Sequence, residues 1–400
     1  MVIPDAAQDS VLSTLAALLQ NVAYAEDISP RIASADPRLC GAPANNPTLD
    51  LGAPTMAANG LNCAVVYCHS PGLANDASVL AAAIKASKPL ARFVAFTLPA
   101  RFTRDYTTPV EIKEEFRARL PFDFVFLLEH AHPNPPFLDP GFARHIVYVP
   151  NVEWITEADE RVVASGSIDT VLLKTRYSGV VFSGLACSKR VKNGQLFTGW
   201  TSADVGEPAA AERLWEQCLH VCGKSPQKNA DVVVTTWMQN PDFPPMTVVA
   251  SAKAGLDLNM PLRASANLTL LLQQQSESQL RALQRKVGIH VCPSFTEGFG
   301  HSLNEARSAA AVLITTAAPP MDELVEDGRS GILVPVRPEN QAPYHLVTAS
   351  RVTSADLGES IRRALAMNGQ QRTLMGRRAR ELYDSGRDQF HASVRRFIAG

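Results

Sequence analysis

The sequence predicts an α/β protein built from two doubly wound domains. Short apolar runs alternate with stretches of helical spacing, and this alternation restarts near the middle of the chain. Strands that are apolar on both sides of the pleat fit parallel sheets covered by helices on both faces. The length of 400 residues agrees with this, because a domain usually holds roughly 100 to 200 residues.

The first domain is expected over residues 61–205. It begins with the apolar run NCAVVYC at 62–68, and the following LANDASVLAAAIKA places its apolar residues at helical spacing. The other expected strands of this domain lie at 92–98, 122–130, 145–150 and 169–175.

The second domain is expected over residues 206–375, after a polar stretch with glycine and proline at 201–212 that suits a linker. The pattern restarts with the strand QCLHVCG at 217–223. Its further expected helices are NADVVVTTWMQ and SESQLRALQRK, and its further strands are MTVVAS, GIHVCPS, AVLITT and GILVPV. The tail from Ser354 onward is expected to be helical, with Ser354 as the capping residue.

Residues 1–60 are expected to be an N-terminal extension of helix and loop. The run VLSTLAALLQNVAYA at 11–25 has the apolar content of a secretory signal, but Asp5 and Asp9 precede it and no lysine or arginine does. We therefore expect an amphipathic helix there. Residues 41–60 are rich in Gly, Ala, Pro and Asn, which indicates a loop.

Composition excludes several classes of function. A formal net charge of −1 gives little steering toward nucleic acid, so no nucleic-acid partner is expected. No run of about 18 or more apolar residues follows the N-terminal stretch, so no membrane span is expected. The cysteines form no C-x-x-C pair and mostly sit in apolar runs, which favours a reducing, cytoplasmic location. They are Cys40, Cys63, Cys68, Cys187, Cys218, Cys222 and Cys292.

The tail is locally basic, with nine arginines against three acids between residues 361 and 396. Such a run is usually a solvated helix face. Peripheral contact with a membrane or another anionic partner is the alternative.

The stretch FTEGFGHSLNEA at 295–306 contains the main candidate residues for a ligand site. It follows an expected strand and opens an expected helix, and ligands of open α/β sheets bind beyond the carboxyl ends of strands. Gly298 and Gly300 let the backbone approach a ligand, and the start of a helix attracts phosphate. Glu297 and Glu305 would repel phosphate but accept hydrogen bonds from sugar hydroxyls. A nucleotide-activated sugar offers both groups.

A structural alternative exists for the same residues. Ser302-x-x-Glu305 matches a helix capping box, in which Glu305 reaches back to the backbone N–H of Ser302. In that case the two glycines would be ordinary turn residues.

The longer stretch PSFTEGFGHSLNEARSAAAVLITTAAPPMDELVEDGRSGILV resembles the E-x7-E donor-site signature of retaining glycosyltransferases of the GT-B fold, in particular family 4, the glycosyl transferases of group 1. The resemblance is strong over residues 285–336 and weaker in the flanks. It implies two Rossmann-like domains facing a central cleft, an acceptor domain followed by a donor domain. It also implies that residues 376–400 form a helix that packs back toward the N-terminal domain.

The resemblance implies roles for residues of the second domain. Glu297 would contact the transferred sugar, Glu305 the ribose diol, and the backbone of residues 298–300, which are Gly298, Phe299 and Gly300, the sugar and phosphate. VCGKSPQKN is similar to the strand and basic loop that hold the donor pyrophosphate, although the loop is shorter here. The contacts it implies are Lys224, Ser225 and Lys228.

The first domain offers fewer matches to the family. Gly72 stands where the resemblance places a glycine loop, and His130 is similar in position to a histidine that contacts the donor sugar, with His132 as its competitor. Asn151 and Glu153 follow the strand at 145–150 and are acceptor-side candidates.

The function that these features imply is transfer of a sugar, with retention, from a nucleotide-diphosphate sugar to a hydroxyl of a glycan, lipid-linked or small-molecule acceptor. The chain contains no D-x-D sequence, and lysines can supply the charge that a metal would provide. No cofactor and no divalent metal are therefore expected beyond the nucleotide-sugar co-substrate. A sugar-nucleotide epimerase, a glycan phosphorylase and an inactive sugar-nucleotide binding protein are the alternatives, and a glycosidase fits least.

Overall fold

The structure is a computed structural model that describes residues 24–27, 60–99, 102, 108–251, 267–273 and 275–399. Most of the expected N-terminal extension lies outside these residues. The chain divides into two compact units, one of residues up to Lys174 with Phe182–Thr198 and Phe390–Gly400, the other of Thr175–Val181 with Gly199–Gln389. The junction was expected at residues 205–206, and the division falls at Gly199.

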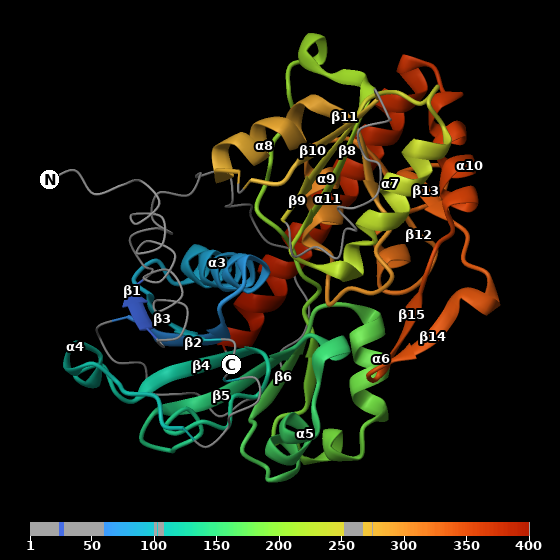
Figure 1. The fold of residues 1–400 in the computed structure, drawn as a ribbon. Coiled ribbons are helices and arrows are strands. Elements are labelled where there is room, and N and C mark those ends of the chain that lie inside the picture. Colours follow the sequence, from blue (N-terminus) through green and yellow to red (C-terminus); the bar gives the residue numbers. More distant parts are fainter. Residues whose placement is uncertain are drawn as a thin grey trace, which may run out of the picture. The chain divides into compact units, whose positions relative to one another are not determined.

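The first unit is built on a sheet whose strand order is β1-β3-β2-β4-β5-β6-β7 (Figure 1). All its strand pairs are parallel except that of β1 with β3, so the predicted parallel sheet is present. The strands are β1 Tyr24–Asp27, β2 Asn62–Cys68, β3 Arg92–Leu98, β4 Phe122–Glu129, β5 Ala143–Pro150, β6 Thr170–Leu173 and β7 Gln195–Phe197.

The edge strand β1 corrects the expectation of a helix over 11–25. Tyr24 and Ala25 belong to β1, where Tyr24 pairs with Thr97 of β3 in antiparallel register. The backbone N–H and C=O groups at the edge of β3 need hydrogen-bond partners, and an extended segment beside it provides them. Pairing with β3, and not the helical spacing of the local sequence, therefore determines the conformation of these residues. The rest of that run lies outside the described residues.

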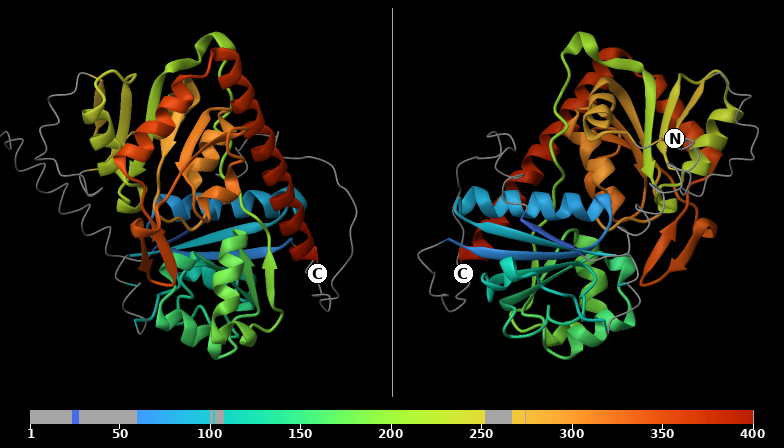
Figure 2. Two further views of the ribbon diagram at one scale, coloured as in Figure 1. Left: turned by 90° about the vertical axis from the view of Figure 1, so that its right-hand side faces the viewer. Right: turned by 60° about the vertical axis from the view of Figure 1, so that its left-hand side comes forward.

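Helices cover both faces of the first sheet, as expected for parallel strands joined by right-handed crossovers. Helix α3 lies along one face and α5 along the other (Figures 1 and 2). A capping box formed by Thr156 and Asp159 starts α5. The helices of this unit are α3 Pro71–Ser87, α4 Glu114–Arg117, α5 Glu157–Ala164 and the short 3-10 helices η3 Val152–Trp154 and η4 Ala186–Arg190, while α6 Arg176–Gly184 runs across the division between the units.

The second unit contains a wholly parallel sheet with the order β10-β9-β8-β11-β12-β13. In chain order this is the 3-2-1-4-5-6 pattern of a doubly wound nucleotide-binding fold. The strands are β8 Leu214–Gly223, β9 Met246–Ala250, β10 Leu268–Leu271, β11 Val287–Cys292, β12 Val312–Thr316 and β13 Gly331–Val334. The helices are α7 Ala230–Gln239, α8 Glu277–Lys286, α9 His301–Ser308, α10 Ser354–Leu365 and the 3-10 helices η5 Ala210–Glu212, η6 Pro226–Lys228, η8 Met321–Leu324 and η9 Pro338–Asn340, while α11 Gly369–Ala399 belongs to this unit up to Gln389 and to the first unit from Phe390.

Alternate residues of the central strands face two different cores. Ile289 and Val291 of β11 pack with α7 and α10, whereas Cys292 of the same strand packs with Leu303 and Ala306 of α9. Because both faces of the strand are buried by apolar neighbours, the run reads as continuously apolar in the sequence.

Three features were not expected. Strands β7 and β10 are short and only partly buried, so they lack a strong apolar run. A two-stranded antiparallel hairpin, β14 Gln341–Tyr344 and β15 Val347–Ser350, precedes α10. Helix α10 is capped by Thr353, whose hydroxyl accepts from the backbone N–H of Asp356 at 3.1 Å, and not by Ser354.

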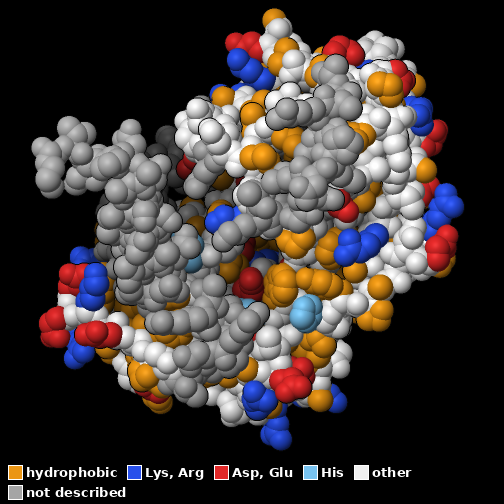
Figure 3. Space-filling model, in the orientation of Figure 1, with side chains coloured by type: hydrophobic (Ala, Val, Ile, Leu, Met, Phe, Trp, Pro, Cys, Tyr) orange, Lys and Arg blue, Asp and Glu red, His pale blue; other side chains and the backbone are white. Residues whose placement is uncertain are grey.

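The arginines of the tail are largely paired with acids from distant parts of the second unit. Arg378 binds Glu326 at 2.8 Å, and Arg380 binds Asp204 at 2.7 Å. Arg372, which is buried, binds Glu216 at 3.0 Å and donates to three backbone carbonyls. On the face shown in Figure 3 basic and acidic side chains are interspersed. The local excess of positive charge therefore serves tertiary packing for these three arginines.

None of the helices in the described part of the chain has the length and apolar content needed to cross a bilayer.

Close packing of α11 against the second unit depends on Gly376. A Cβ added there would overlap the backbone carbonyl oxygen of Ala310, whereas a Cβ at Gly386 of the same helix meets nothing within 4 Å. We expect Gly376→Ala to lower the free energy of unfolding by about 1–3 kcal/mol through overpacking. Gly386→Ala should raise it by up to about 1 kcal/mol through helix propensity. Urea unfolding of both variants tests this, and equal effects at the two glycines would contradict it.

Candidate functional site

The centre of the second sheet presents the loop between β11 and α9. Gly300 is the N-cap of α9 and has a φ of 95°, a left-handed conformation that a side chain would strain. No side chain caps this helix. The loop 298–300 lies at the carboxyl edge of the sheet, and Gly300 leaves its backbone open to a ligand because it has no side chain. The N-terminus of α9, which follows directly, carries the positive end of the helix dipole.

The capping-box alternative is wrong for this helix. Since Gly300 is the N-cap, Ser302 lies inside the first turn. The carboxylate of Glu305 instead accepts a hydrogen bond of 2.7 Å from the side-chain amide of Gln284, which is buried in α8. Glu305 is thus held from outside its own helix.

Glu297 forms an ion pair with Lys228, whose ammonium also donates to the hydroxyl of Ser302 at 3.1 Å. The two charged side chains are only 16% and 11% exposed. Burial alone would lower the pKa of Lys228, but the adjacent carboxylate of Glu297 raises it above its usual value, with a smaller contribution from Glu305. Lys228 is therefore a fixed positive charge beside two carboxylates.

The loop that carries Lys228 is joined to the glycine loop by hydrogen bonds. Asn229 adopts a left-handed conformation with a φ of 58° and donates its side-chain amide to the carbonyl of Pro293 at 2.9 Å. The backbone N–H of Phe295 donates to the carbonyl of Gln227 at 2.9 Å. These contacts place the carboxyl ends of β8 and β11 in one site.

The other two predicted pyrophosphate contacts, Lys224 and Ser225, form no hydrogen bond or ion pair with Glu297 or Glu305 in the structure. Lys224 is exposed at the tip of the loop. The hydroxyl of Ser225 donates to the side-chain oxygen of Gln227 at 2.5 Å. Of the three residues, the structure brings only Lys228 into contact with Glu297.

Aromatic residues form a wall beside this site that sequence reasoning missed. The guanidinium of Arg351 stacks 3.9 Å from the ring centre of Phe295, and Tyr344 of the hairpin packs edge-on to the same ring at 5.6 Å. Arg351 also donates to the side-chain oxygen of Asn229 at 3.3 Å. Because each hairpin strand has only four residues and β14 is largely exposed, no periodic signal in the sequence marks the hairpin. Phe299, predicted to line the donor, is buried and packs edge-on to His301 at 5.6 Å.

In the first unit, His130 follows β4 and its Nδ1 lies 3.0 Å from the carboxylate of Asp159. Burial would lower the pKa of His130, but Asp159 raises it above the usual value. His132 is wholly buried, its Nε2 lies 3.2 Å from the carbonyl of Leu128, and burial lowers its pKa to about 3. Only His130 thus has a carboxylate partner that favours its protonated form.

The acceptor-side candidates lie at the carboxyl end of the neighbouring strand β5. Asn151 stands at the N-cap position of η3 without a side-chain capping bond, and it accepts a hydrogen bond of 2.7 Å from Lys174. The ammonium of Lys174 also binds Asp76 at 2.5 Å. Glu153 is buried in the same short helix. Gly72 lies in the first turn of α3, not in a loop, and a Cβ there would have room. Lys174 and Asp76 are buried charges that no motif indicated.

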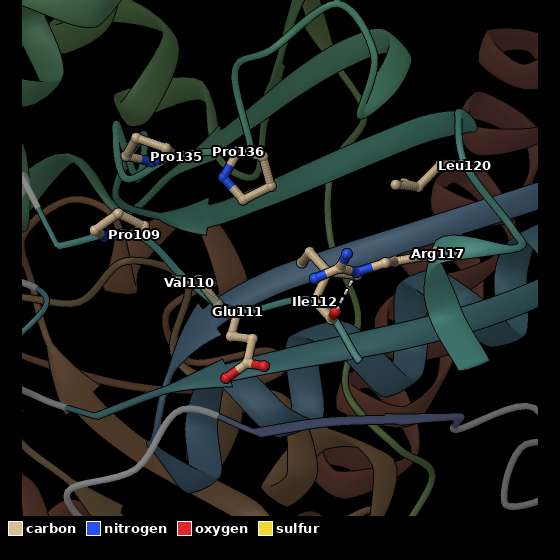
Figure 4. A pocket seen from close by; sticks show the side chains of 8 residues that line it. All are labelled: Pro109, Val110, Glu111, Ile112, Arg117, Leu120, Pro135 and Pro136. Carbon is tan, nitrogen blue, oxygen red and sulfur yellow. Dashed lines mark hydrogen bonds between the residues drawn. The ribbon is translucent and has the colours of Figure 1, made fainter. Parts of the chain in front are cut away.

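A surface hollow of about 380 Å³ lies elsewhere in the first unit (Figure 4). Its lining is largely apolar and includes none of the predicted site residues. Arg117 is one of its lining residues and donates to the carbonyl of Ile112 at 2.9 Å.

Among the residues that the structure describes, no three His, Cys, Asp or Glu side chains gather where they could hold a metal ion.

Comparison with known proteins supports the reading of the second unit. Residues 261–348 match the family model of glycosyl transferases group 1. The resemblance predicted from the sequence is thereby confirmed for the part of the chain that carries the two glutamates. No curated protein matches the sequence.

Solved structures confirm the predicted fold class, two Rossmann-like α/β domains of the GT-B type. The sucrose-phosphate synthase of Thermosynechococcus elongatus superposes with a TM-score of 0.60 at 15% identity, covering 81% of this chain and 94% of its own. Anabaena HepE in complex with UDP-glucose gives 0.59 at 13% identity, covering 84% and 99%. The pneumococcal O-GlcNAc transferase GtfA, with UDP and GlcNAc, gives 0.51 at 14% identity over 67% of this chain and 55% of that chain. At these identities the likeness shows the fold.

Buried neutral histidines should make the protein acid-sensitive. Burial lowers the pKa of His132 to about 3 and of His220 and His290 to about 4. Between these values and the ordinary pKa near 6.5, the unfolded chain binds more protons than the folded one, so stability falls as the pH falls. We expect His132→Gln to reduce this slope by up to about 1.4 kcal/mol per pH unit. Urea unfolding at pH 7, 6 and 5 tests it, and an unchanged slope in the variant would contradict it.

Proposed function

We propose that the protein is a retaining glycosyltransferase that moves a sugar from a nucleotide-diphosphate sugar to a hydroxyl acceptor without a divalent metal. The observation that carries this proposal is the grouping of Glu297, Lys228 and Glu305 beside the glycine backbone that starts α9. The match of residues 261–348 to glycosyl transferases group 1 supports it.

The chemistry of the second unit follows from its charges. The carboxylates of Glu297 and Glu305 accept hydrogen bonds from hydroxyls of the sugar and the ribose, and such charge-assisted bonds are strong. When the glycosidic bond breaks, the leaving diphosphate gains negative charge. Lys228 and the backbone N–H groups at the start of α9 stabilise that charge because they are already in position in a partly buried site.

Lys228 has a second consequence for the resting state. Its ammonium neutralises Glu297, so the site does not present two uncompensated carboxylates to an incoming diphosphate. When a diphosphate binds, the ammonium is shared between phosphate and carboxylate. Lys224, which is exposed, adds a contact at the rim.

The first unit supplies the remaining groups. His130, oriented by Asp159, contacts the transferred sugar, and Asn151 and Glu153 bind on the acceptor side. In a retaining transfer the departing phosphate oxygen takes the proton of the acceptor hydroxyl on the same face of the sugar. The protein then acts by positioning and electrostatic stabilisation.

Uridine is the first base of the donor nucleotide to test, because two of the solved structures that share this fold contain UDP or UDP-glucose. We propose a cytoplasmic location, supported by the free, buried state of every cysteine in the described residues. The acceptor is a glycan, a lipid-linked sugar or a small molecule. Any peripheral contact of the tail with a membrane would use those of its arginines that form no ion pair with an acid of the protein.

Donor binding is the direct test of this proposal. We expect one of UDP-, GDP- or ADP-glucose, or UDP-N-acetylglucosamine, to raise the stability of the protein by about 2.7 kcal/mol at 100 times its dissociation constant. Addition of EDTA should leave both the thermal shift and transfer unchanged. Loss of transfer with chelator would contradict metal independence. Turnover of the donor without an acceptor would indicate an epimerase. A requirement for phosphate would indicate a phosphorylase, and donor binding without nucleotide release would indicate an inactive binding protein.

Substitutions separate the roles of the charged residues. Glu297→Gln should bind nucleotide almost as the wild type does but lose about 100-fold or more in kcat, because its hydrogen bonds strengthen in the transition state. Lys228→Met should weaken UDP binding more than Lys224→Met does, since Lys228 is the partly buried cation. Glu277→Gln on the surface of α8 is a matched control. Equal kcat values for Glu297→Gln and Glu277→Gln would exclude the proposed role of Glu297.

A further inference from the structure

The turn after β4 holds Glu129 in a strained backbone conformation. The N–H of His130 donates to the carbonyl of Leu128 at 2.9 Å, which makes Glu129 the central residue of a γ-turn. Its φ is 69°, so this is the rare, strained form of that turn. A non-glycine residue with positive φ costs free energy, and such residues cluster at functional sites.

The surroundings fix this turn from two sides. The buried hydroxyl of Tyr148 in β5 donates to the backbone carbonyl of Glu129 at 3.0 Å. Asp159 accepts from the N–H of Ala131 at 2.6 Å and binds the ring of His130 at 3.0 Å. The backbone on both sides of the Glu129 side chain is therefore held by hydrogen bonds from other elements.

A row of polar side chains leads to the Glu129 carboxylate. Asp76 of α3 binds Lys174 at the end of β6 at 2.5 Å, and Lys174 donates to the side-chain oxygen of Asn151 at 2.7 Å. Asn151 follows Pro150, the residue that pairs with Glu129 across β4 and β5, and the side chain of Asn151 lowers the pKa of the Glu129 carboxyl. Because its amide oxygen is engaged by an ammonium, Asn151 presents its NH₂ group to the carboxylate.

This row is costly for the fold. Lys174 and Asp76 are each 2% exposed, and a buried ion pair rarely repays the loss of hydration of both charges. Replacing such a pair by apolar residues of similar volume is often neutral or stabilising. Its effect is to fix which end of the Asn151 amide faces Glu129.

Glu129 itself is only partly buried at this edge of the sheet. A carboxylate has two oxygens with about four acceptor sites, so a single amide such as that of Asn151 leaves most of them for a ligand. Burial raises the pKa of Glu129, while His130 and Lys174 oppose that shift and Asp76 adds to it. The group is an acceptor-only oxygen pair at the carboxyl ends of β4 and β5, where ligands of open parallel sheets bind.

We propose that Glu129 is a binding residue for the hydroxyl groups of a neutral sugar acceptor, and that Asn151, Lys174 and Asp76 are positioning residues that orient it. The proposal rests on the glycosyltransferase function proposed above. It gives the acceptor a chemical class, since a hydroxyl donates to the carboxylate whereas a phosphate or carboxylate at the same place would be repelled.

The test compares Glu129→Gln with Glu115→Gln, an exposed glutamate of α4 in the same unit. Wild type and variants are mixed with UDP-glucose, and the affinity of glucose, N-acetylglucosamine, fructose, myo-inositol and glycerol is measured by saturation-transfer NMR. We expect Glu129→Gln to weaken the best-bound of these sugars about tenfold or more, with UDP-glucose affinity unchanged. Glu115→Gln should bind as the wild type does.

The positioning residues are tested by the double variant Asp76→Leu/Lys174→Met, which removes both buried charges together so that neither is left unpaired. It should stay folded by circular dichroism and weaken the same sugar several-fold. The variant removes Lys174, which lowers the pKa of Glu129, and Asp76, which raises it by less. The ¹³C signal of the Glu129 carboxyl should therefore titrate at a higher pH than in the wild type.

The outcomes separate this proposal from the glycosyltransferase function. Failure of the wild type to bind any nucleotide sugar overturns the function itself. Normal UDP-glucose binding together with unchanged sugar affinity in Glu129→Gln overturns the role of Glu129, as does failure of every sugar in the panel to bind the wild type. An unchanged Glu129 titration in the double variant overturns the positioning role.

Discussion

The ion pair between Lys228 and Glu297 is the interaction on which the second unit's site depends. It joins the loop after β8 to the loop after β11, two segments separated by 69 residues in sequence. The strands that carry these loops are adjacent in the sheet. With an ammonium placed between them, a carboxylate suited to hydroxyls and a helix start suited to phosphate can occupy one small site without mutual repulsion.

The same principle operates differently in the first unit. There a buried ammonium, that of Lys174, lies between Asp76 and Asn151 instead of beside a glycine loop. Both sites place one cation beside an acidic side chain at the carboxyl ends of parallel strands. Lys228 is partly buried and also binds the hydroxyl of Ser302, whereas Lys174 is buried and also binds the amide oxygen of Asn151. In each case the charge costs hydration and in return orients a polar side chain that the solvent would otherwise leave mobile. The arginines of α11 show a third use of positive charge, because their partners Asp204 and Glu326 tie the tail to the second unit.

Much of the fold could be predicted because buried parallel strands appear as apolar runs in the sequence, and the helices that cover them show apolar residues at helical spacing. The runs at 62–68 and 92–98 coincide with β2 and β3, and NADVVVTTWMQ contains α7. Short or half-exposed elements have neither an apolar run nor a clear apolar periodicity. Strand β7, strand β10 and the hairpin β14–β15 were missed for this reason, and β1 replaced part of an expected helix because pairing with β3 outweighs local spacing.

The candidate site was predicted in its residue types but not in its contacts. Local sequence placed Glu297, Gly300 and Glu305 on a strand–loop–helix unit, since strand periodicity, glycine and helical spacing are properties of neighbouring residues. Only the tertiary structure decided that Gln284 holds Glu305, that Lys228 rather than Lys224 meets Glu297, and that the helix lacks a capping box. It also decided that Asp76 and Lys174, 98 residues apart, form a buried pair. These outcomes depend on which strands lie side by side, and a single sequence carries no local signal for partners so far apart along the chain.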